Sequence, residues 1–471
     1  MAKPATLFVC TECGAQTRQF FGRCSGCGGW NTLVEQAAAP AADQRRRRPV
    51  AAAVAPPLAR RSEPMAAVGE RPLQRLASGY GELDRVLGGG LVPGSLVLLG
   101  GDPGIGKSTL LLQSACAMAA RTSVLYVSAE ESAQQVKLRW RRLAESSPAA
   151  GADSDLQLLA ETDLELVLQE LESLRPAVAI IDSIQALHDG ELSSAPGSVA
   201  QVRECAAALA RIAKRQDTAL LLVGHVTKEG MLAGPKVLEH LVDAVLTFEG
   251  DRFASHRLLR AVKNRFGATH ELGVFEMQGR GLAEVTNPSE LFLGAEEPSS
   301  GTATIVACEG TRPLVVELQA LVSTTSYASP RRSATGIAVN RLHQILAVLE
   351  KHMGLPLSRF DCYLAVAGGL EVEEPAADLG VAAAAVASYR DLTLPPGTVL
   401  IGELGLGGQL RPVSQLELRL GESARLGFTR AVVPRGSGLG AVAAGLGLQL
   451  LEAGTIAEAL VAALGTNPAD A

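Results

Sequence analysis

The stretch LVLLGGDPGIGKST at residues 96–109 decides the fold, because it joins an apolar strand, a glycine-rich loop and the start of a helix. Its loop fits the pattern G-x4-G-K-[S/T], in which backbone N–H groups and the helix N-terminus bind phosphate. We predict that Lys107 reaches the β- and γ-phosphates of ATP and that Ser108 binds Mg²⁺. The predicted nucleotide-binding residues are Gly101, Asp102, Pro103, Gly104, Ile105, Gly106, Lys107, Ser108 and Thr109.

Acidic residues end two further apolar strands, where a nucleotide site needs them. The run at 178–182 ends in Asp182, which we predict to complete the Mg²⁺ shell and to serve catalysis. The run at 125–131 ends in Glu130 and Glu131, one of which is expected to polarise the attacking water. An ordinary strand-end or helix-capping carboxylate gives the same pattern, and the sequence does not choose between the two glutamates.

Outward from the loop, apolar strands alternate with helical segments, which is typical of an α/β fold with a parallel sheet covered on both faces. A second α/β unit begins near residue 301, with strands near 302–322 and 361–367 and helices near 337–353 and 377–389. The expected organisation has four parts, at residues 1–30, 31–67, 68–287 and 288–471.

The first 30 residues carry two CxxC pairs separated by ten residues, Cys10/Cys13 and Cys24/Cys27. Four thiolates at this spacing suit a tetrahedral structural Zn²⁺ better than unliganded thiols or a redox pair. We therefore expect a zinc ribbon at 1–30.

Residues 31–67 are rich in alanine, proline and arginine and are expected to form a flexible linker. Its run Arg45–Arg48 is a solubilising segment or a weak DNA contact.

Composition limits the remaining classes. The 471 residues carry a net charge of −6, so nucleic acid would be contacted by local basic patches. No apolar run is long enough to span a membrane, and the N-terminus lacks a secretory pattern, so a cytoplasmic protein is expected. The remaining cysteines are expected to be buried thiols: Cys116, Cys205, Cys308 and Cys362.

Taken together, these motifs resemble the bacterial RadA/Sms family, relatives of the RecA recombinase. The phosphate loop, the segment YVSAEES at 126–132 and IIDS at 180–183 follow the RecA core in order and spacing. The segment VKNRFG at 262–267 matches the KNRFG motif typical of RadA/Sms. The resemblance implies a RecA-type P-loop ATPase core between a zinc ribbon and a C-terminal α/β domain like that of the Lon protease.

The resemblance also implies roles for particular residues. Glu130 would activate water, and His225 would sense the γ-phosphate. Residues 188–202 and 225–236, with Lys228 and Lys236 in the second segment, would line a DNA channel. Lys263 and Arg265 would reach the ATP of a neighbouring subunit.

The implied activity is a DNA-stimulated ATPase acting on recombination intermediates. It would form a homo-hexamer on single-stranded and branched DNA, beside a RecA filament. Branch migration during homologous recombination and double-strand break repair would be its role. A ring-shaped scaffold or KaiC-like signalling ATPase without translocation is the alternative, since RecA-type cores serve both.

The C-terminal unit departs from Lon where Lon does its chemistry. Alanine stands at the position of the nucleophilic serine (Ala376) and glutamate at that of the lysine (Glu417). Without a hydroxyl and an amine no dyad forms, so peptidase activity is not expected.

DNA contacts are expected at Arg331, Arg332 and Arg341. No aromatic platform for base stacking is evident, so we expect binding through the phosphate backbone.

Overall fold

The computed structural model describes most of the chain. The described residues are 6–10, 16–17, 19–25, 29–30, 32–37, 65, 74–144, 156–225, 235–250, 255–269, 271–293 and 299–465. They divide into two compact units, Met1–Thr269 with Phe275–Glu284 and His270–Val274 with Val285–Ala471. Strand β11 (Leu272–Gln278) has residues in both units, so the limits 68–287 and 288–471 remain a proposal. Among the described residues, no helix is long and apolar enough to cross a membrane.

The N-terminal segment forms a small antiparallel sheet in the order β2-β1-β3. Its strands are β1 (Thr6–Cys10), β2 (Gln16–Thr17) and β3 (Leu33–Ala37). Cys10 ends β1 opposite Leu33 and shares a small buried cluster with Cys24. The sheet therefore brings two cysteines from different CxxC pairs into one interior.

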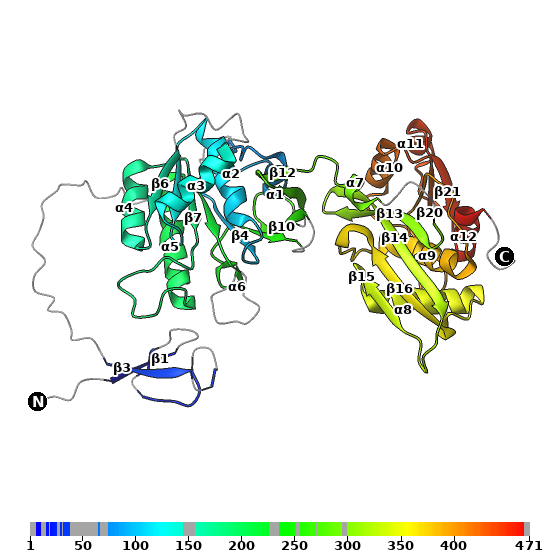
Figure 1. Cartoon of the computed structure of the whole chain (residues 1–471), viewed down its shortest axis with the longest axis horizontal. Helices are drawn as coiled ribbons and strands as arrows, with labels where there is room; N and C mark the ends of the chain where they lie inside the picture. The colour runs from blue at the N-terminus through cyan, green and yellow to red at the C-terminus, as the bar shows by residue number, and fades with distance from the viewer. Residues whose placement is uncertain are drawn as a thin grey trace, which may run out of the picture. The chain divides into compact units, whose positions relative to one another are not determined.

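The remainder of the first unit is built on a nine-stranded sheet in the order β12-β11-β10-β9-β4-β8-β7-β5-β6 (Figure 1). Strands β9, β4, β8, β7, β5 and β6 are parallel to one another, whereas β10 pairs antiparallel with β9 and β12 pairs antiparallel with β11. The strands are β4 (Leu96–Gly101), β5 (Val124–Ser128), β6 (Leu156–Ala160), β7 (Val178–Asp182), β8 (Ala219–Val223), β9 (Ala244–Glu249), β10 (His256–Asn264), β11 and β12 (Gly281–Glu284). The helices are α1 (Gly81–Leu87), α2 (Lys107–Ala119), α3 (Ala133–Ala144), α4 (Leu164–Leu174), α5 (Val199–Gln216) and α6 (Pro235–Leu238).

Alternate residues of the central strands enter two separate hydrophobic cores, as expected when helices cover both faces of a parallel sheet. Val97 and Leu99 of β4 pack with α1, α2 and α3, whereas Leu96 and Leu98 pack with α4 and α5. The parallel arrangement places the carboxyl ends of β4, β5, β7 and β8 at one edge of the sheet. The phosphate loop and the acidic strand ends must therefore lie at that edge.

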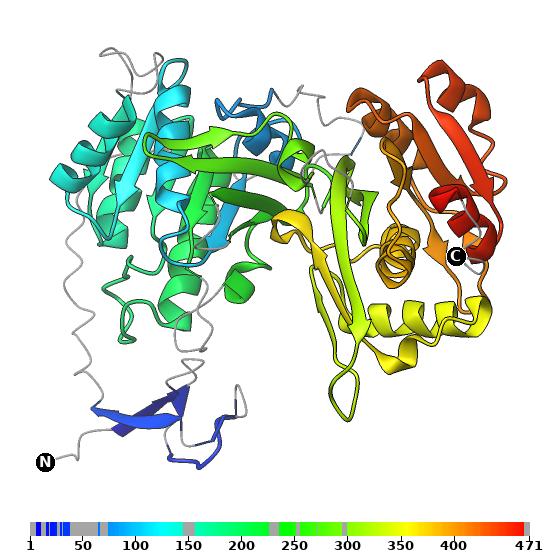
Figure 2. The ribbon, with the colours of Figure 1, turned by 45° about the vertical axis from the view of Figure 1, so that its right-hand side comes forward.

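The second unit is a seven-stranded mixed sheet in the order β15-β16-β14-β13-β17-β20-β21, with helices against it. Figure 2 shows its long neighbouring strands β13 and β14, which pair antiparallel. The sheet strands are β13 (Thr302–Glu309), β14 (Arg312–Thr324), β15 (Arg332–Thr335), β16 (Phe360–Val366), β17 (Thr398–Leu400), β20 (Arg430–Pro434) and β21 (Gln449–Ala453), and β18 (Glu403–Leu404) and β19 (Leu410–Arg411) form a separate pair. The helices are α7 (Ser289–Phe292), α8 (Val339–Met353), α9 (Asp378–Arg390), α10 (Leu416–Arg425), α11 (Gly440–Gly445) and α12 (Ile456–Leu464), with short 3-10 turns η2 (Leu357–Arg359), η3 (Ala367–Gly369) and η4 (Pro375–Ala377).

Helix α9 is buried all round, which explains its run of alanines. Every residue from Asp378 to Ala387 is buried, so this part of the helix has no solvent-exposed face. It lies so close to β13 that a Cβ at Gly380 would fall 2.1 Å from Ile305 Cγ2. The small side chains thus allow a central helix against the sheet, in agreement with the helix expected at 377–389.

Candidate active site

The phosphate loop connects the end of β4 to the start of α2. Gly101 adopts a φ of 149°, and a Cβ there would fall 2.4 Å from the Phe248 carbonyl oxygen, so this position requires glycine. Lys107 is the first residue of α2 and is 4% exposed. Its Nζ donates to the carbonyls of Gly101 at 2.7 Å and Asp102 at 2.9 Å. Desolvation by burial lowers the pKa of Lys107, although nearby carboxylates oppose that shift.

Asp182 ends β7 beside the start of α2. Its carboxylate is buried, it accepts a hydrogen bond from the Tyr126 hydroxyl at 2.6 Å, and it is hydrogen-bonded to Ser108. Burial raises the pKa of Asp182, and these two hydrogen bonds oppose the rise. A hydroxyl and a carboxylate at one point are oxygen ligands of the kind that Mg²⁺ prefers. The geometry therefore fits the predicted pairing of Ser108 with Asp182.

The structure separates the two candidate glutamates. The register pairs Ser128 of β5 with Asp182 of β7, so Glu130 lies near the Asp182 carboxylate. Glu130 Oε1 accepts from the Ser183 hydroxyl and contacts His225 Nε2 at 3.1 Å. These contacts, led by the His225 bond, lower the pKa of Glu130 despite partial burial. Glu131 instead forms an ion pair with Arg139 at 2.5 Å. The position of Glu130 favours it as the base.

His225 follows β8 at the same edge of the sheet. Its backbone carbonyl accepts from Gln185 Nε2 at 3.3 Å, and its side chain turns to Glu130. Within the described part of the chain, His225 Nδ1 is buried and has no hydrogen-bond partner. Of the DNA-contact candidates that follow, Lys228 lies outside the described residues, and Lys236 is in α6 with a side chain that is not described.

The two cations of the KNRFG motif are bound within their own chain. Lys263 Nζ donates to the carbonyls of Glu239 at 2.5 Å and Val242 at 2.9 Å. Arg265 donates to Asp243 at 2.9 Å, and its side chain is 53% exposed. Both groups would have to exchange these partners to act on a neighbouring subunit.

The N-terminal ribbon holds half of the predicted zinc set within the described residues. Cys10 and Cys24 are buried together, and the Cys10 thiol donates to the Thr32 hydroxyl at 3.2 Å. Cys13 and Cys27 lie outside the described residues. Two buried cysteines drawn from different CxxC pairs fit one tetrahedral site.

The ribbon also exposes aromatic side chains that the sequence did not single out. Phe20, Phe21 and Trp30 are exposed, and the Arg23 guanidinium lies 5.8 Å from the Trp30 ring centroid. The expectation that the chain offers no aromatic platform for base stacking did not consider these exposed rings and stays a prediction. The clustering of Phe20, Phe21 and Trp30 within eleven residues of a protein with only 4% aromatics was the available signal.

The arginines expected to contact DNA differ in their surroundings. The Arg331 guanidinium is exposed and stacks 3.6 Å from the centroid of the Tyr327 ring. Arg332 is half-buried and donates to the Leu357 carbonyl at 3.3 Å. Arg341 is bound to Asp378 through two donors, one at 2.7 Å. Arg331 is therefore the most accessible of the three, and Arg341 is occupied in joining α8 to α9.

The two positions that the expected resemblance to Lon compares with a catalytic dyad carry neither a serine nor a lysine. Ala376 is buried in η4, and Glu417 is exposed on α10. Next to them Arg419, with no exposed surface, donates to both oxygens of Glu374 at 2.7 and 2.5 Å. It also donates to the Val306 carbonyl at 2.5 Å. The ion pair between the partly exposed Glu374 and the buried Arg419 therefore involves residues two positions along the chain from Ala376 and Glu417.

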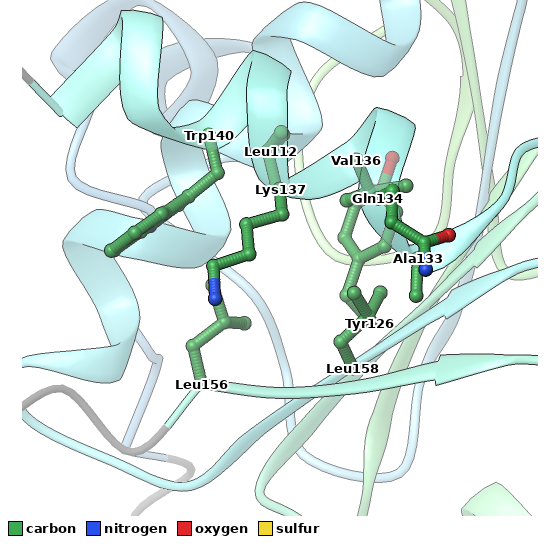
Figure 3. Close-up of a pocket in the computed structure, with 9 residues that line it drawn as sticks. All are labelled: Leu112, Tyr126, Ala133, Gln134, Val136, Lys137, Trp140, Leu156 and Leu158. Carbon is green, nitrogen blue, oxygen red and sulfur yellow. The ribbon is translucent and has the colours of Figure 1, made fainter.

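An apolar cavity shares Tyr126 with the surroundings of Asp182 but is not lined by the phosphate loop. Figure 3 shows this apolar pocket of about 520 Å³ between α3 and the edge strand β6, with Trp140 and Lys137 among the residues that line it. Tyr126 also lines the pocket, while its hydroxyl donates to Asp182. None of the predicted site residues lines this pocket.

Sequence reasoning missed Tyr126 and Ser183, which hold the two acidic side chains. Both belong to the motifs YVSAEES and IIDS, but their contacts depend on the register between β5 and β7.

The scattered cysteines were expected to be buried thiols, and this holds with one correction. Cys116, Cys205 and Cys362 are buried, whereas Cys308 is only half-buried near the β13–β14 turn.

A phosphate loop on the central strand, with carboxylates on neighbouring strand ends, defines a P-loop ATPase of the RecA type. Family models agree: residues 63–231 match an AAA domain, and residues 8–35 match the rubredoxin metal binding domain.

Curated relatives match over nearly the whole chain. The DNA repair protein RadA of Synechocystis is 58% identical, over 99% of this chain and 96% of that protein. The RadA proteins of Bacillus subtilis, at 47% over 99% and 100%, and Pseudomonas aeruginosa, at 49% over 95% and 96%, are also similar. The solved RadB recombinase, with a TM-score of 0.36 and 23% identity, covers 45% of this chain and 99% of that chain and adds no support. The chain belongs to the family of the DNA repair protein RadA.

Proposed function

We propose that this protein is a DNA-stimulated ATPase that processes recombination intermediates and promotes branch migration during homologous recombination and double-strand break repair. The observation that carries the proposal is the convergence of Lys107, Asp182 and Glu130 at one sheet edge, with His225 touching Glu130. The relatives' description as DNA repair proteins supports DNA as the effector.

The site residues divide the work of hydrolysis. The loop N–H groups and Lys107 bind the phosphates of ATP. Glu130 accepts the proton of a water molecule whose oxygen forms a bond to the γ-phosphorus, while the bond from that phosphorus to ADP breaks. The products are ADP and inorganic phosphate. Ser108 and Asp182 would hold Mg²⁺, which neutralises charge developing on the phosphate oxygens.

Assembly and DNA binding complete the proposal. Lys263 and Arg265 act across the interface of a homo-hexamer, which makes hydrolysis depend on ring formation. DNA lies against Lys228 and Lys236 and is attracted by Arg331, mainly through its phosphates. The cysteines at 10, 13, 24 and 27 bind a structural Zn²⁺, and the RecA filament is a further partner.

Steady-state hydrolysis by the wild type and Lys107→Ala tests the proposal, with and without single-stranded and forked DNA. We expect DNA to increase turnover and the substitution to abolish it. Movement of a four-way junction, driven by ATP, then tests branch migration. An ATP turnover that neither single-stranded nor forked DNA changes would contradict the proposed DNA-stimulated ATPase and favour an ATP-regulated ring scaffold. Steady ATP-dependent casein cleavage would contradict the absence of peptidase activity that Ala376 and Glu417 support.

A further inference from the structure

The proposed catalytic base is held by two different side chains at a single oxygen. Glu130 Oε1 accepts from the Ser183 hydroxyl and lies 3.1 Å from His225 Nε2. Neither contact belongs to the phosphate loop: Ser183 follows β7, the neighbour of β5, and His225 follows β8, the next strand beyond β7. The direction and the proton affinity of this carboxylate are therefore set by β7 and β8.

Ser183 is suited to a fixed role. It has no exposed surface and directly follows Asp182. The next residue, Ile184, donates its backbone N–H to Val223 of β8 at 3.0 Å. A buried hydroxyl on so constrained a backbone fixes the orientation of the carboxylate that accepts its hydrogen bond. Ser183 thus joins the proposed metal-binding strand end to the proposed base.

His225 is suited to a reversible role. Its backbone carbonyl is held by Gln185, but within the described residues its ring makes one polar contact, to Glu130, while Nδ1 is buried without a partner. With its proton on Nε2, the ring donates to the lone pairs that Glu130 needs to accept a proton from water. Rotation of this ring would release Glu130 without moving the strand.

We propose that Ser183 is the positioning residue for Glu130, and that His225 restrains the same oxygen until it is drawn away. The inference rests on the proposed role of Glu130 as the base. A γ-phosphate oxygen is an alternative acceptor for the His225 donor, and His225 begins the segment 225–236 proposed to contact DNA. Exchange of His225 from Glu130 to phosphate would therefore link nucleotide and DNA binding to release of the base.

Three substitutions in the full chain test this assignment, and two further substitutions serve as controls. Ser183→Ala removes the fixed donor, Ser183→Thr restores a hydroxyl, and His225→Ala removes the restraining donor. Ser114→Ala is the matched control for serine, because Ser114 is equally buried in the same unit but donates to the Ser78 carbonyl at 2.7 Å. His352→Ala, in the second unit, is the control for histidine. ATP turnover, KM and binding of a fluorescent ATP analogue are measured with and without single-stranded DNA.

We expect Ser183→Ala to lower kcat about ten-fold, equivalent to about 1.4 kcal/mol in the activation free energy, with KM and nucleotide affinity within about two-fold of wild type. Ser183→Thr should recover most of kcat. His225→Ala should raise DNA-free turnover several-fold and remove most of the DNA stimulation. Ser114→Ala and His352→Ala should match the wild type.

Equal kcat values for the alanine variants of Ser183 and Ser114 would overturn the positioning role. A fall in DNA-free turnover on His225→Ala would overturn the restraint and make His225 a second positioning residue. Wild-type turnover that ignores DNA would instead contradict the proposed function, and the DNA-free comparisons would still decide the role of Ser183. Circular dichroism and the retained nucleotide affinity separate these results from misfolding.

Discussion

Replacing Arg419 by methionine should destabilise the second unit through an uncompensated charge. Arg419 has no exposed surface and donates to both oxygens of Glu374, whose side chain is 22% exposed. Removing one partner of a buried ion pair costs roughly 3–5 kcal/mol. Because water reaches part of Glu374, we expect the free energy of unfolding to fall by an amount near the lower limit, about 3 kcal/mol.

The charge contribution can be isolated by a second change. In Glu374→Gln with Arg419→Met, no charge is left buried, and the glutamine oxygen can still accept the Cys308 backbone N–H that Glu374 accepts at 2.5 Å. The double variant should therefore lose only about 1 kcal/mol. Arg411→Met is the control, since its pair with Glu403 spans 3.4 Å with side chains 53% and 31% exposed. Such an exposed pair contributes about 1 kcal/mol or less.

Calorimetry of the full chain provides the assay, with hydrogen exchange in α10 identifying the transition of the second unit. For a unit of this size, about 2–4 °C is lost per kcal/mol, so Arg419→Met should lower its melting temperature by roughly 6–12 °C. The melting temperature of the second unit in the double variant should fall by roughly 2–4 °C. If the double variant melted as low as the single one, packing by the arginine stem rather than charge would be responsible, and the reasoning would be refuted.

Three further outcomes are expected. Tyr126→Phe removes the 2.6 Å donor to Asp182 and should lower turnover about ten-fold while raising the Mg²⁺ concentration needed for half-maximal rate; an unchanged Mg²⁺ titration would contradict this. Burial raises the pKa of Cys116 to about 11 and of Cys205 to about 12, so both stay protonated at pH 8 and gain thiolate only as the pH approaches those values; mass spectrometry should find them unmodified by iodoacetamide until the chain is unfolded. Cys10→Ser should remove one zinc per chain by elemental analysis, and zinc retained at full stoichiometry would exclude the proposed set.

The sequence predicted those features of the site that depend on short spacings. The apolar run before Gly101 and the aspartate ending the run at 178–182 identified β4 and β7, because parallel strands read as continuous hydrophobic segments. The helix expected at 337–353 is α8, which begins two residues later, at Val339. Helix ends depend on capping contacts, which periodicity does not specify.

Features that depend on pairing between distant residues could not be predicted in this way. The preference for Glu130 over Glu131 arises from the register of β5 with β7, which places Ser183 next to Glu130. Arg341 had been expected to contact DNA, yet it pairs with Asp378, 37 residues away. A charged residue looks the same in the sequence whether it contacts solvent or a buried partner.

The ion pair between Glu374 and Arg419 also has a consequence for peptidase activity. Restoring a serine at Ala376 and a lysine at Glu417 would return two functional groups without restoring the surroundings in which they react. The guanidinium of Arg419 would still be tied to Glu374 and to the Val306 carbonyl, and removing it first would cost stability. We therefore expect that Ala376→Ser with Glu417→Lys would not by itself produce peptide-bond hydrolysis while this ion pair remains.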